Sequence, residues 1–307
     1  MTELDGADRL DPALRALATT RTDFSAAAIR LTRDPFNERR RITAGQTGAG
    51  DVRIDEDSVG GVAVRIYRGG AAPSPAVVYC HAGGFALGNL DTDHRQCVEL
   101  ARRGRCTVVS VDYRLAPEHP HPAALEDASA VLRWVADDAA SLGVDPTRLA
   151  VAGSSAGAAL AACLAQRAAD GSLPPVVFQL LHQPVLDDRP TPSKAEFRAS
   201  PAFDGEGAEL MWRHYLHPEV GPQAAVPARR QEFAGLAPAL ITCAEIDPFR
   251  DEAIDYALRL LRAGVSAELH VFARACHGFD SLLPEWPGSQ RLFALQGDVL
   301  SSALHGG

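Results

Sequence analysis

Apolar and polar residues alternate in different ways along this chain, and the changes in period predict its elements. Residues 1–45 place apolar positions among charged neighbours, as a helix does. Residues 52–54 and 62–66 alternate apolar and polar side chains, which is typical of half-buried strands. Residues 76–80 and 107–111 are nearly continuous apolar runs, and such runs indicate strands buried on both faces. The pattern therefore predicts a helical start followed by a sheet.

Helices and buried strands then follow each other to the end of the chain. The pattern predicts helices over 92–103, 123–140, 156–169, 250–263 and 287–303, and strands over 148–153, 176–181, 239–244 and 267–272. Strands that alternate with helices of this length imply βαβ units. We therefore expect an α/β fold with a mainly parallel central sheet that is covered by helices on both faces.

One stretch, residues 187–235, interrupts this rhythm. It is rich in proline, charged residues and aromatic residues, and it separates two predicted core strands. We interpret it as a cap insertion, with the N-terminal helices of residues 1–45 contributing to the same cap. Residues 46–186 and 236–307 would then form the catalytic core.

Composition excludes several classes of protein. The chain has 307 residues, of which 46% are hydrophobic and 22% charged, and its net charge is −9; these values describe a soluble globular protein. An acidic chain has no basic face for phosphates, so we expect no nucleic-acid partner. No apolar run approaches the length of about 18 residues that crosses a bilayer, and the N-terminus lacks a signal-peptide pattern. The six cysteines form no CxxC pair, and a reducing cytoplasm is the simplest location.

The segment 153–157, Gly-Ser-Ser-Ala-Gly, carries the clearest chemical signal. It directly follows a predicted buried strand and directly precedes a predicted helix. A tight turn between strand and helix lifts a serine hydroxyl above the sheet, and the two glycines avoid clashes within the turn. The alternative is a small-residue turn without chemistry. The strand–turn–helix context favours Ser155 as a nucleophile.

A second glycine-rich segment, His-Ala-Gly-Gly-Phe at 81–85, follows the predicted strand 76–80. Consecutive glycines allow backbone N–H groups to face a cleft, as an oxyanion hole requires. Alone, this segment would be an ordinary turn, but its place upstream of the serine strand favours an oxyanion loop. We expect His81 to hold this loop and not to act as a base.

A serine nucleophile needs a base, and the chain has ten histidines. His277 stands in a loop just after the last predicted strand, where it could reach the serine, and the order Ser, Asp, His is a known triad arrangement. His270 lies within that strand, and His214 and His217 lie in the insertion. These positions favour His277 as the general base.

The acid that orients this base should follow the strand 239–244. Asp251 and Glu252 fall in the first turn of the next helix, where the helix dipole favours acids without any catalytic role. Glu245 and Asp247 come earlier, and Asp247 precedes a proline that fixes an extended loop. Asp247 is therefore our choice.

Asp91, Asp93 and His94 form a local cluster that could suggest a metal. The cluster lies at a predicted helix start, where aspartate is a favoured cap, and it lacks the ligand number of known sites. We expect no metal and no cofactor.

Together these segments resemble the bacterial hormone-sensitive-lipase-like branch of the α/β-hydrolase family. The resemblance runs from about residue 45 to about residue 300 and rests on HAGGF (81–85), DYRLAPEHPHPAA (112–124), GSSAG (153–157), DPFRDE (247–252) and HGF (277–279). It implies an α/β-hydrolase fold with a helical cap. It also implies a Ser155, His277 and Asp247 triad, with the N–H groups of Gly83, Gly84 and Ala156 as the oxyanion hole.

Two positions depart from the family pattern. Ala82 replaces the first glycine of the oxyanion loop, and this position is not one of the expected oxyanion donors. Ser154 stands where the family usually has Asp or Thr. The second departure leaves the subgroup and the substrate preference open. We interpret Asp112–Glu118 as a buried polar network that braces the core beside the site and has no chemistry of its own. Within the implied cap and beside it, Phe85, Trp212, Tyr215 and Phe279 are the candidates to line an acyl or alcohol pocket, and plain packing is the alternative for each of them.

These observations predict a serine carboxylesterase that hydrolyses short-to-medium acyl esters through an acyl-enzyme. Its partner would be a small-molecule ester, and the resemblance implies a homodimer through residues 267–272. A lactonase or an amidase stays open, because serine acyl transfer serves several carbonyl substrates. A non-catalytic ligand-binding protein on the same scaffold also stays open, although the presence of His277 argues against it.

Overall fold

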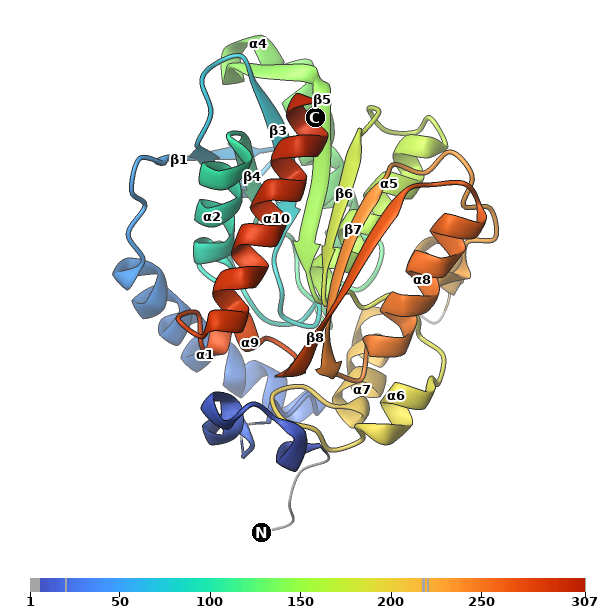
Figure 1. Cartoon of the computed structure of the whole chain (residues 1–307). Helices are drawn as coiled ribbons and strands as arrows, with labels where there is room; N and C mark the ends of the chain where they lie inside the picture. Colours follow the sequence, from blue (N-terminus) through green and yellow to red (C-terminus); the bar gives the residue numbers. More distant parts are fainter. Residues whose placement is uncertain (1–5, 20, 217–218, 220, 307) are drawn as a thin grey trace.

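A twisted eight-stranded sheet forms the centre of the computed structural model, which describes residues 6–19, 21–216, 219 and 221–306 (Figure 1). The strands are β1 (Arg53–Val59), β2 (Val62–Arg68), β3 (Ser74–Cys80), β4 (Thr107–Val111), β5 (Val144–Ser154), β6 (Phe178–His182), β7 (Ala239–Ile246) and β8 (Ala267–Cys276). Their spatial order is β1-β2-β4-β3-β5-β6-β7-β8, and all pairs from β4 to β8 are parallel. Only β1–β2 and β2–β4 pair antiparallel within the described sheet. The predicted mainly parallel sheet is confirmed.

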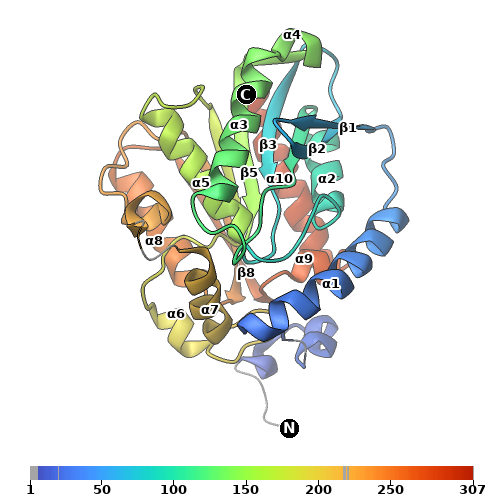
Figure 2. The same ribbon diagram turned by 180° about the vertical axis from the view of Figure 1, so that it is seen from behind.

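Helices cover both faces of this sheet (Figures 1 and 2). They are α1 (Ala26–Gln46), α2 (His94–Gly104), α3 (Ala123–Asp137), α4 (Ala139–Leu142), α5 (Ala156–Ala169), α6 (Pro192–Glu196), α7 (Gly205–Tyr215), α8 (Arg250–Arg262), α9 (Phe279–Leu282) and α10 (Pro287–His305). Within the described ranges, every helix is too short or too polar to span a bilayer.

Strand β3 shows how the sheet divides the core into two apolar layers. Successive side chains of a strand point to opposite faces. Val77 accordingly belongs to the apolar cluster that contains Leu300 of α10, whereas Val78 belongs to the cluster that contains Leu164 of α5. All seven residues of β3 are buried, as the continuous apolar run predicts.

The N-terminal segment differs from the expected continuous helical region. Before α1, the described chain forms two short 3-10 turns, Ala7–Arg9 and Pro12–Leu17. Leu10 and Leu14 are fully buried in an apolar cluster that also contains Phe272 of β8. Tertiary packing at the end of the sheet, and not helical propensity, therefore holds this segment.

Helices α1, α6 and α7 gather near one end of the sheet, where the parallel strands have their carboxyl ends (Figure 2). His214 of α7 hydrogen-bonds the carbonyl of Phe24, just before α1, at 2.9 Å, and Arg33 of α1 donates to the carbonyl of Ala86, in the loop after β3, at 2.8 Å. The division of the chain into a core and a cap at residues 45, 187 and 235 stays a prediction.

A buried ion pair anchors the 187–196 segment to α8. Lys194 is the single lysine of the chain, and its Nζ lies 2.5 Å from Glu252 Oε2. The same ammonium group donates to the carbonyls of Asp187 and Arg189 at 2.5 and 3.0 Å. Glu252 Oε1 accepts from the N–H of Leu186 at 2.7 Å. The pair thus joins the start of the insertion to the core.

This pair predicts a pH-dependent contribution to stability. Burial raises the pKa of Glu252 to about 7, and the charge of Lys194 opposes the shift only in part. Because the unfolded carboxyl titrates near pH ~4.3, the folded chain keeps a proton that the unfolded chain has released, and the contribution of Glu252 falls as pH rises from about 4 to about 7. We expect the free energy of unfolding of the wild type, relative to Lys194→Met/Glu252→Gln, to decrease over this range and then level off. Urea unfolding at each pH measures it, and a difference that rises with pH would contradict the assignment.

Candidate active site

Ser155 occupies a sharp turn between β5 and α5. The strand ends at Ser154 and the helix begins at Ala156. Ser155 adopts φ 56° and ψ −121°, a conformation that residues with a side chain rarely take, and its N–H donates to the carbonyl of His182 at 2.8 Å. The turn is therefore strained and is held in place by the neighbouring strand β6.

The two glycines of this turn are required by close approaches. A Cβ atom on Gly153 would collide with the carbonyl of Gly157, and one on Gly157 would collide with the carbonyl of Cys80 at the end of β3. Because backbone atoms cannot move aside cheaply, each position needs glycine. The turn thus packs closely against the first residues of α5 on one side and against the end of β3 on the other.

The structure brings Ser155, His277 and Asp247 into one hydrogen-bonded row. Ser155 Oγ lies 2.9 Å from His277 Nε2, and His277 Nδ1 lies 2.9 Å from Asp247 Oδ2. The three residues are 4, 7 and 0% exposed. A carboxylate beside Nδ1 accepts a hydrogen bond from the N–H there, which keeps the ring proton on Nδ1 and leaves Nε2 free to accept the serine proton. The row can therefore move a proton away from the serine hydroxyl.

Asp247 is the acid that reaches this histidine, while the other acids near it bind elsewhere. Its Oδ1 accepts from the N–H of Phe249 at 2.8 Å, which fixes the carboxylate. Glu245 accepts from Arg9 at 2.7 Å, and Asp251 accepts from the N–H of Ser193 at 2.9 Å. His270 is exposed on β8, and His217 lies outside the described residues.

The loop after β3 turns its backbone toward the same place. Gly84 has φ 60°, and a Cβ there would collide with the ring of Phe24. No hydrogen bond within the described part of the chain uses the N–H of Gly83 or Gly84. Ala156 is the first residue of α5, where the N–H groups lack partners within the helix. Gly83, Gly84 and Ser155 therefore line one cavity, and Ala156, the third predicted oxyanion donor, directly follows Ser155 in the chain.

Asp93 holds this loop, which the sequence did not predict. Asp93 occupies the N-cap position of α2, but its side chain makes no capping bond, so the expected capping role is wrong. Instead Oδ2 accepts from the N–H of Ala82 at 2.8 Å and from the hydroxyl of Tyr79 at 3.0 Å. Burial raises the pKa of Asp93. No spacing rule connects an acid with a backbone N–H eleven positions earlier in the chain, so only the tertiary structure shows this contact.

His81 holds the oxyanion loop in place through a stacked ring and a hydrogen bond. Its ring stacks on that of Tyr113, with centroids 4.2 Å apart, and its Nδ1 hydrogen-bonds the carbonyl of Ala82 at 2.7 Å. Tyr113 donates its hydroxyl to the carbonyl of His81 at 2.7 Å. Burial lowers the pKa of His81, which favours the neutral ring. These contacts agree with a structural role for His81 and Tyr113, whereas Arg114 and Glu118 are exposed, so the expectation of a buried network over Asp112–Glu118 holds only in part.

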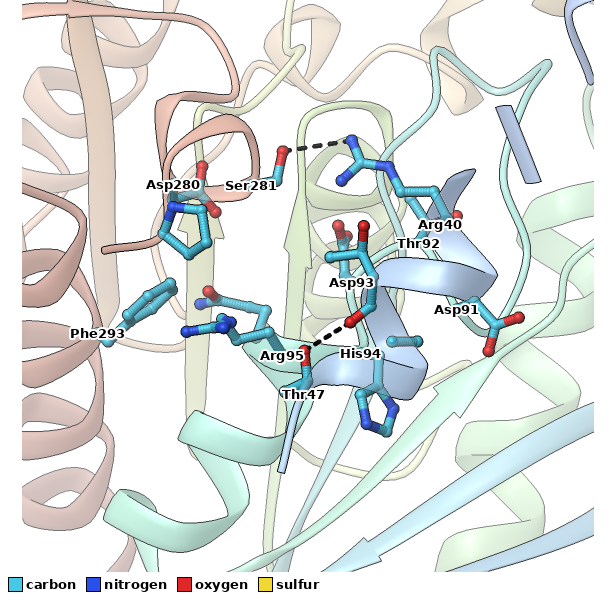
Figure 3. Close-up of a pocket in the computed structure, with 14 residues that line it drawn as sticks. Arg40, Thr47, Asp91, Thr92, Asp93, His94, Arg95, Asp280, Ser281 and Phe293 are labelled. Carbon is cyan, nitrogen blue, oxygen red and sulfur yellow. Dashed lines mark hydrogen bonds between the residues drawn. The ribbon is translucent and has the colours of Figure 1, made fainter. Parts of the chain in front are cut away.

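A cavity of about 330 Å³ opens above the serine. Its walls include Ser155, His277 and the oxyanion loop, and its apolar lining comes from Phe24, Phe36, Leu87, Phe203 and Leu282. A smaller cavity of about 30 Å³, shown in Figure 3, adjoins it and shares Arg40, Asp93, Asp280 and Ser281. The site is thus enclosed by the N-terminal segment, the 187–235 insertion and the loop around α9.

The four residues expected to line the substrate pocket lie elsewhere. Phe85 stacks on Tyr215 with centroids 3.7 Å apart, Trp212 packs beside them, and Phe279 packs against Trp286. None of the four is among the residues that line the active-site cavity. They are core residues of the cap and of the sheet edge, because their rings find apolar partners there. The aromatic walls of the cavity come instead from Phe24, Phe36 and Phe203.

The acidic cluster at the start of α2 is bound to protein partners. Asp91 accepts from Arg65 at 2.7 Å, and His94 Nδ1 lies 3.0 Å from the hydroxyl of Tyr67. Among the described residues, no three or more His, Cys, Asp or Glu side chains are arranged to hold a metal.

Comparison with known proteins identifies the family. A family model described as "alpha/beta hydrolase fold" matches residues 77–281. Esterase LipI of Mycobacterium tuberculosis is 42% identical over 259 residues, which are 81% of this chain and 78% of that protein.

Two solved structures agree with this result over nearly the whole chain. The crystal structure of esterase LipW from Mycobacterium marinum has a TM-score of 0.97 and 66% identity and covers 99% of both chains. A structure titled "Bacterial Heroin Esterase" has a TM-score of 0.91 and 35% identity and covers 97% of this chain and 99% of that one. The chain therefore belongs to the hormone-sensitive-lipase-like branch of the α/β-hydrolase family.

Proposed function

We propose that this protein is a serine carboxylesterase that works through an acyl-enzyme. The row of Ser155 Oγ, His277 Nε2 and Nδ1, and Asp247 Oδ2, with both distances at 2.9 Å, carries the proposal. The names of its esterase relatives support the same reaction class.

In the first step Ser155 Oγ attacks the ester carbonyl while His277 Nε2 takes the serine proton. Asp247 holds the ring in the tautomer that can accept this proton, and its charge stabilises the imidazolium. The N–H groups of Gly83, Gly84 and Ala156 would stabilise the oxyanion, and one such donor is typically worth about 3 kcal/mol in the transition state. His277 then protonates the leaving alcohol, which yields the acyl-enzyme.

In the second step water attacks the acyl carbonyl. His277 removes a proton from this water, and the second tetrahedral intermediate uses the same oxyanion donors. Collapse of that intermediate breaks the bond to Ser155 Oγ, returns the proton to the serine and releases the carboxylic acid.

The size of the cavity predicts a preference for short-to-medium acyl chains. A space of about 330 Å³ bounded by Phe24, Phe36 and Phe203 suits a small ester better than a palmitoyl chain. We expect kcat/KM for p-nitrophenyl esters to be highest in the acetate-to-octanoate range and to fall toward palmitate. Faster hydrolysis of the palmitoyl than of the butyryl ester would contradict the preference, and no hydrolysis of any member would contradict the esterase assignment.

Two further expectations stay predictions. The homodimer through residues 267–272 would use β8, the outer strand of the sheet, and sedimentation of the purified chain would decide it. All six cysteines are buried free thiols, and the cytoplasmic location would be decided by cell fractionation.

A further inference from the structure

Helix α1 places two arginines in the wall of the active-site cavity. Arg39 and Arg40 line the same cavity as Ser155 and His277. Much of the remaining wall is apolar, including Phe24 and Phe36. Arg39 is exposed, whereas Arg40 is half-buried, and withdrawing a charge from water without a charged partner is costly.

Arg40 is half-buried, and its guanidinium has few partners. Its Nη2 donates to Ser281 Oγ at 3.3 Å, and Figure 3 shows the side chain extended from α1 toward that residue. Its Nε is buried and has no hydrogen-bond partner in the described part of the chain. Arg40 also forms no ion pair with a described residue. Since an arginine side chain has five N–H donors, most of its hydrogen-bond capacity is unused in the described structure.

The nearby acids do not use up this donor capacity. Asp93 and Asp280 line the same cavity, but Asp93 Oδ2 accepts from Ala82 and Tyr79, and Asp280 Oδ1 faces His182 Nε2 at 3.1 Å. Burial lowers the pKa of Arg40, although the charges of Asp93 and Asp280 oppose this shift. The described partners of the Arg40 guanidinium are thus the Ser281 hydroxyl and the face of the Phe36 ring, 5.0 Å from its centroid, and no described carboxylate accepts a hydrogen bond from it.

Two more groups supply donors or positive charge at the cavity. Gln183 Oε1 accepts from the N–H of Gly278 at 2.6 Å, while its Nε2 is buried and has no partner in the described structure. The Arg39 guanidinium lies over the Phe36 ring at 5.6 Å from the centroid, and Arg39 is exposed. Arg40 and Gln183, which both line the cavity, thus each carry one buried donor atom without a partner in the described structure.

We propose that the preferred substrates are esters that carry a carboxylate, which Arg40 binds while Ser155 attacks the ester carbonyl. This inference rests on the proposed function and names its substrate class. A carboxylate matches a guanidinium in shape and charge and can accept two of its N–H groups together. The apolar walls would hold the carbon chain between the carboxylate and the ester. Because the net charge of −9 repels anions at long range, such recognition depends on these local groups.

The carboxylate could belong to the acyl part or to the alcohol part of the ester, and two matched substrate pairs separate these cases. Mono-4-nitrophenyl adipate and its methylated neutral form test the acyl side. 4-Carboxyphenyl butyrate and its methyl ester test the alcohol side. We would measure kcat/KM for all four with the wild type, Arg40→Met, Arg40→Lys and the control Arg41→Met. Arg41 lies on the same helix and forms an exposed pair with Glu38 at 2.7 Å.

In Arg40→Met we expect kcat/KM for the anionic member of one pair to fall about 10- to 100-fold, as the loss of a charged hydrogen bond predicts. The neutral member should change by less than about threefold, because it makes no such bond. Arg40→Lys should lie between Arg40→Met and the wild type, and Arg41→Met should match the wild type. The pair that responds tells which side of the ester carries the carboxylate.

Thermal unfolding separates substrate recognition from a structural role of Arg40. Residues kept for binding often cost stability, so Tm of Arg40→Met should equal or exceed that of the wild type. An equal fall for the anionic and neutral members, or no fall for either anionic ester, would overturn the inference. Hydrolysis of neutral esters that depends on Ser155 but shows no anion discrimination would overturn it and leave the proposed function intact. A wild type that hydrolyses none of the four esters would overturn both.

Discussion

Replacing Ser155 with alanine is expected to lower kcat for p-nitrophenyl butyrate by at least about 10⁴-fold. The hydroxyl is the single group in hydrogen-bond contact with His277 Nε2, at 2.9 Å, among the described residues. Removing it abolishes the covalent route, and the oxyanion donors can then supply only the smaller part of the rate enhancement. The assay follows p-nitrophenol release at neutral pH with the variant at high concentration.

Ser154→Ala is the matched control for this prediction. Ser154 also lines the cavity and precedes the nucleophile directly, but no hydrogen bond joins its side chain to His277 in the described structure. We expect its kcat to stay within a few-fold of the wild type. Equal losses in the two variants, with unchanged thermal unfolding, would remove Ser155 from its assigned role.

At pH 8, above the Glu252 pKa of about 7, replacing Lys194 with methionine is expected to lower the free energy of unfolding by about 3 kcal/mol. The substitution leaves the Glu252 carboxyl buried without its cation. Removing one partner of a buried ion pair typically costs about 3–5 kcal/mol, which agrees with the expected loss. It also removes the donors to the carbonyls of Asp187 and Arg189. Urea unfolding measures the change.

The double variant Lys194→Met/Glu252→Gln should recover most of this loss. Glutamine is neutral, and its carbonyl oxygen can still accept from the N–H of Leu186, as Glu252 Oε1 does. Arg41→Met breaks an exposed pair with Glu38 and should cost less than about 1 kcal/mol. A double variant as unstable as Lys194→Met would contradict the assignment of the loss to an unpaired buried charge.

Sequence reasoning located the chemistry well, because the relevant signals are local. Ser155 stands in a turn whose glycines are required by contacts with the adjacent strand and helix, so strand, turn and nucleophile appear together in one short segment. Asp247 and His277 follow the ends of β7 and β8, and parallel strands bring such ends to the same edge of a sheet. That these three side chains meet at one edge of the sheet was therefore predictable from the glycine-flanked turn, the chain order and the ends of the strands, whereas their catalytic roles stay proposals.

The substrate pocket could not be predicted in the same way. Phe85 directly follows the glycines of the oxyanion loop and Tyr215 lies in the insertion, so both were expected to line the pocket. Their rings stack on each other, which leaves no room for a substrate between them. The walls of the cavity include Phe24 and Phe36, which come from the N-terminal segment far from the catalytic motifs. Which face of a cap helix points inward depends on how the cap docks, and periodicity does not contain that information.

Arg40 and Asp93 show a second limit of sequence reasoning. Asp93 has the position of a helix cap, yet tertiary contacts from Ala82 and Tyr79 take its carboxylate. Arg40 is one residue of a basic run on α1, and such runs usually lie on solvated helix faces. Only the packing of α1 against the loop around α9 shows that Arg40 reaches the cavity.

Intact-protein and peptide mass spectrometry after reaction with diethyl p-nitrophenyl phosphate would test the central claim most directly. This reagent transfers a diethylphosphoryl group to an activated serine and stops at a stable adduct. The account predicts one adduct per chain, on Ser155 of the peptide that contains Gly153–Gly157, and loss of esterase activity in proportion to labelling. His277→Ala should label far more slowly, because the serine then lacks its base. Full inactivation with the adduct on another residue, or full esterase activity with Ser155 modified, would contradict the proposed mechanism.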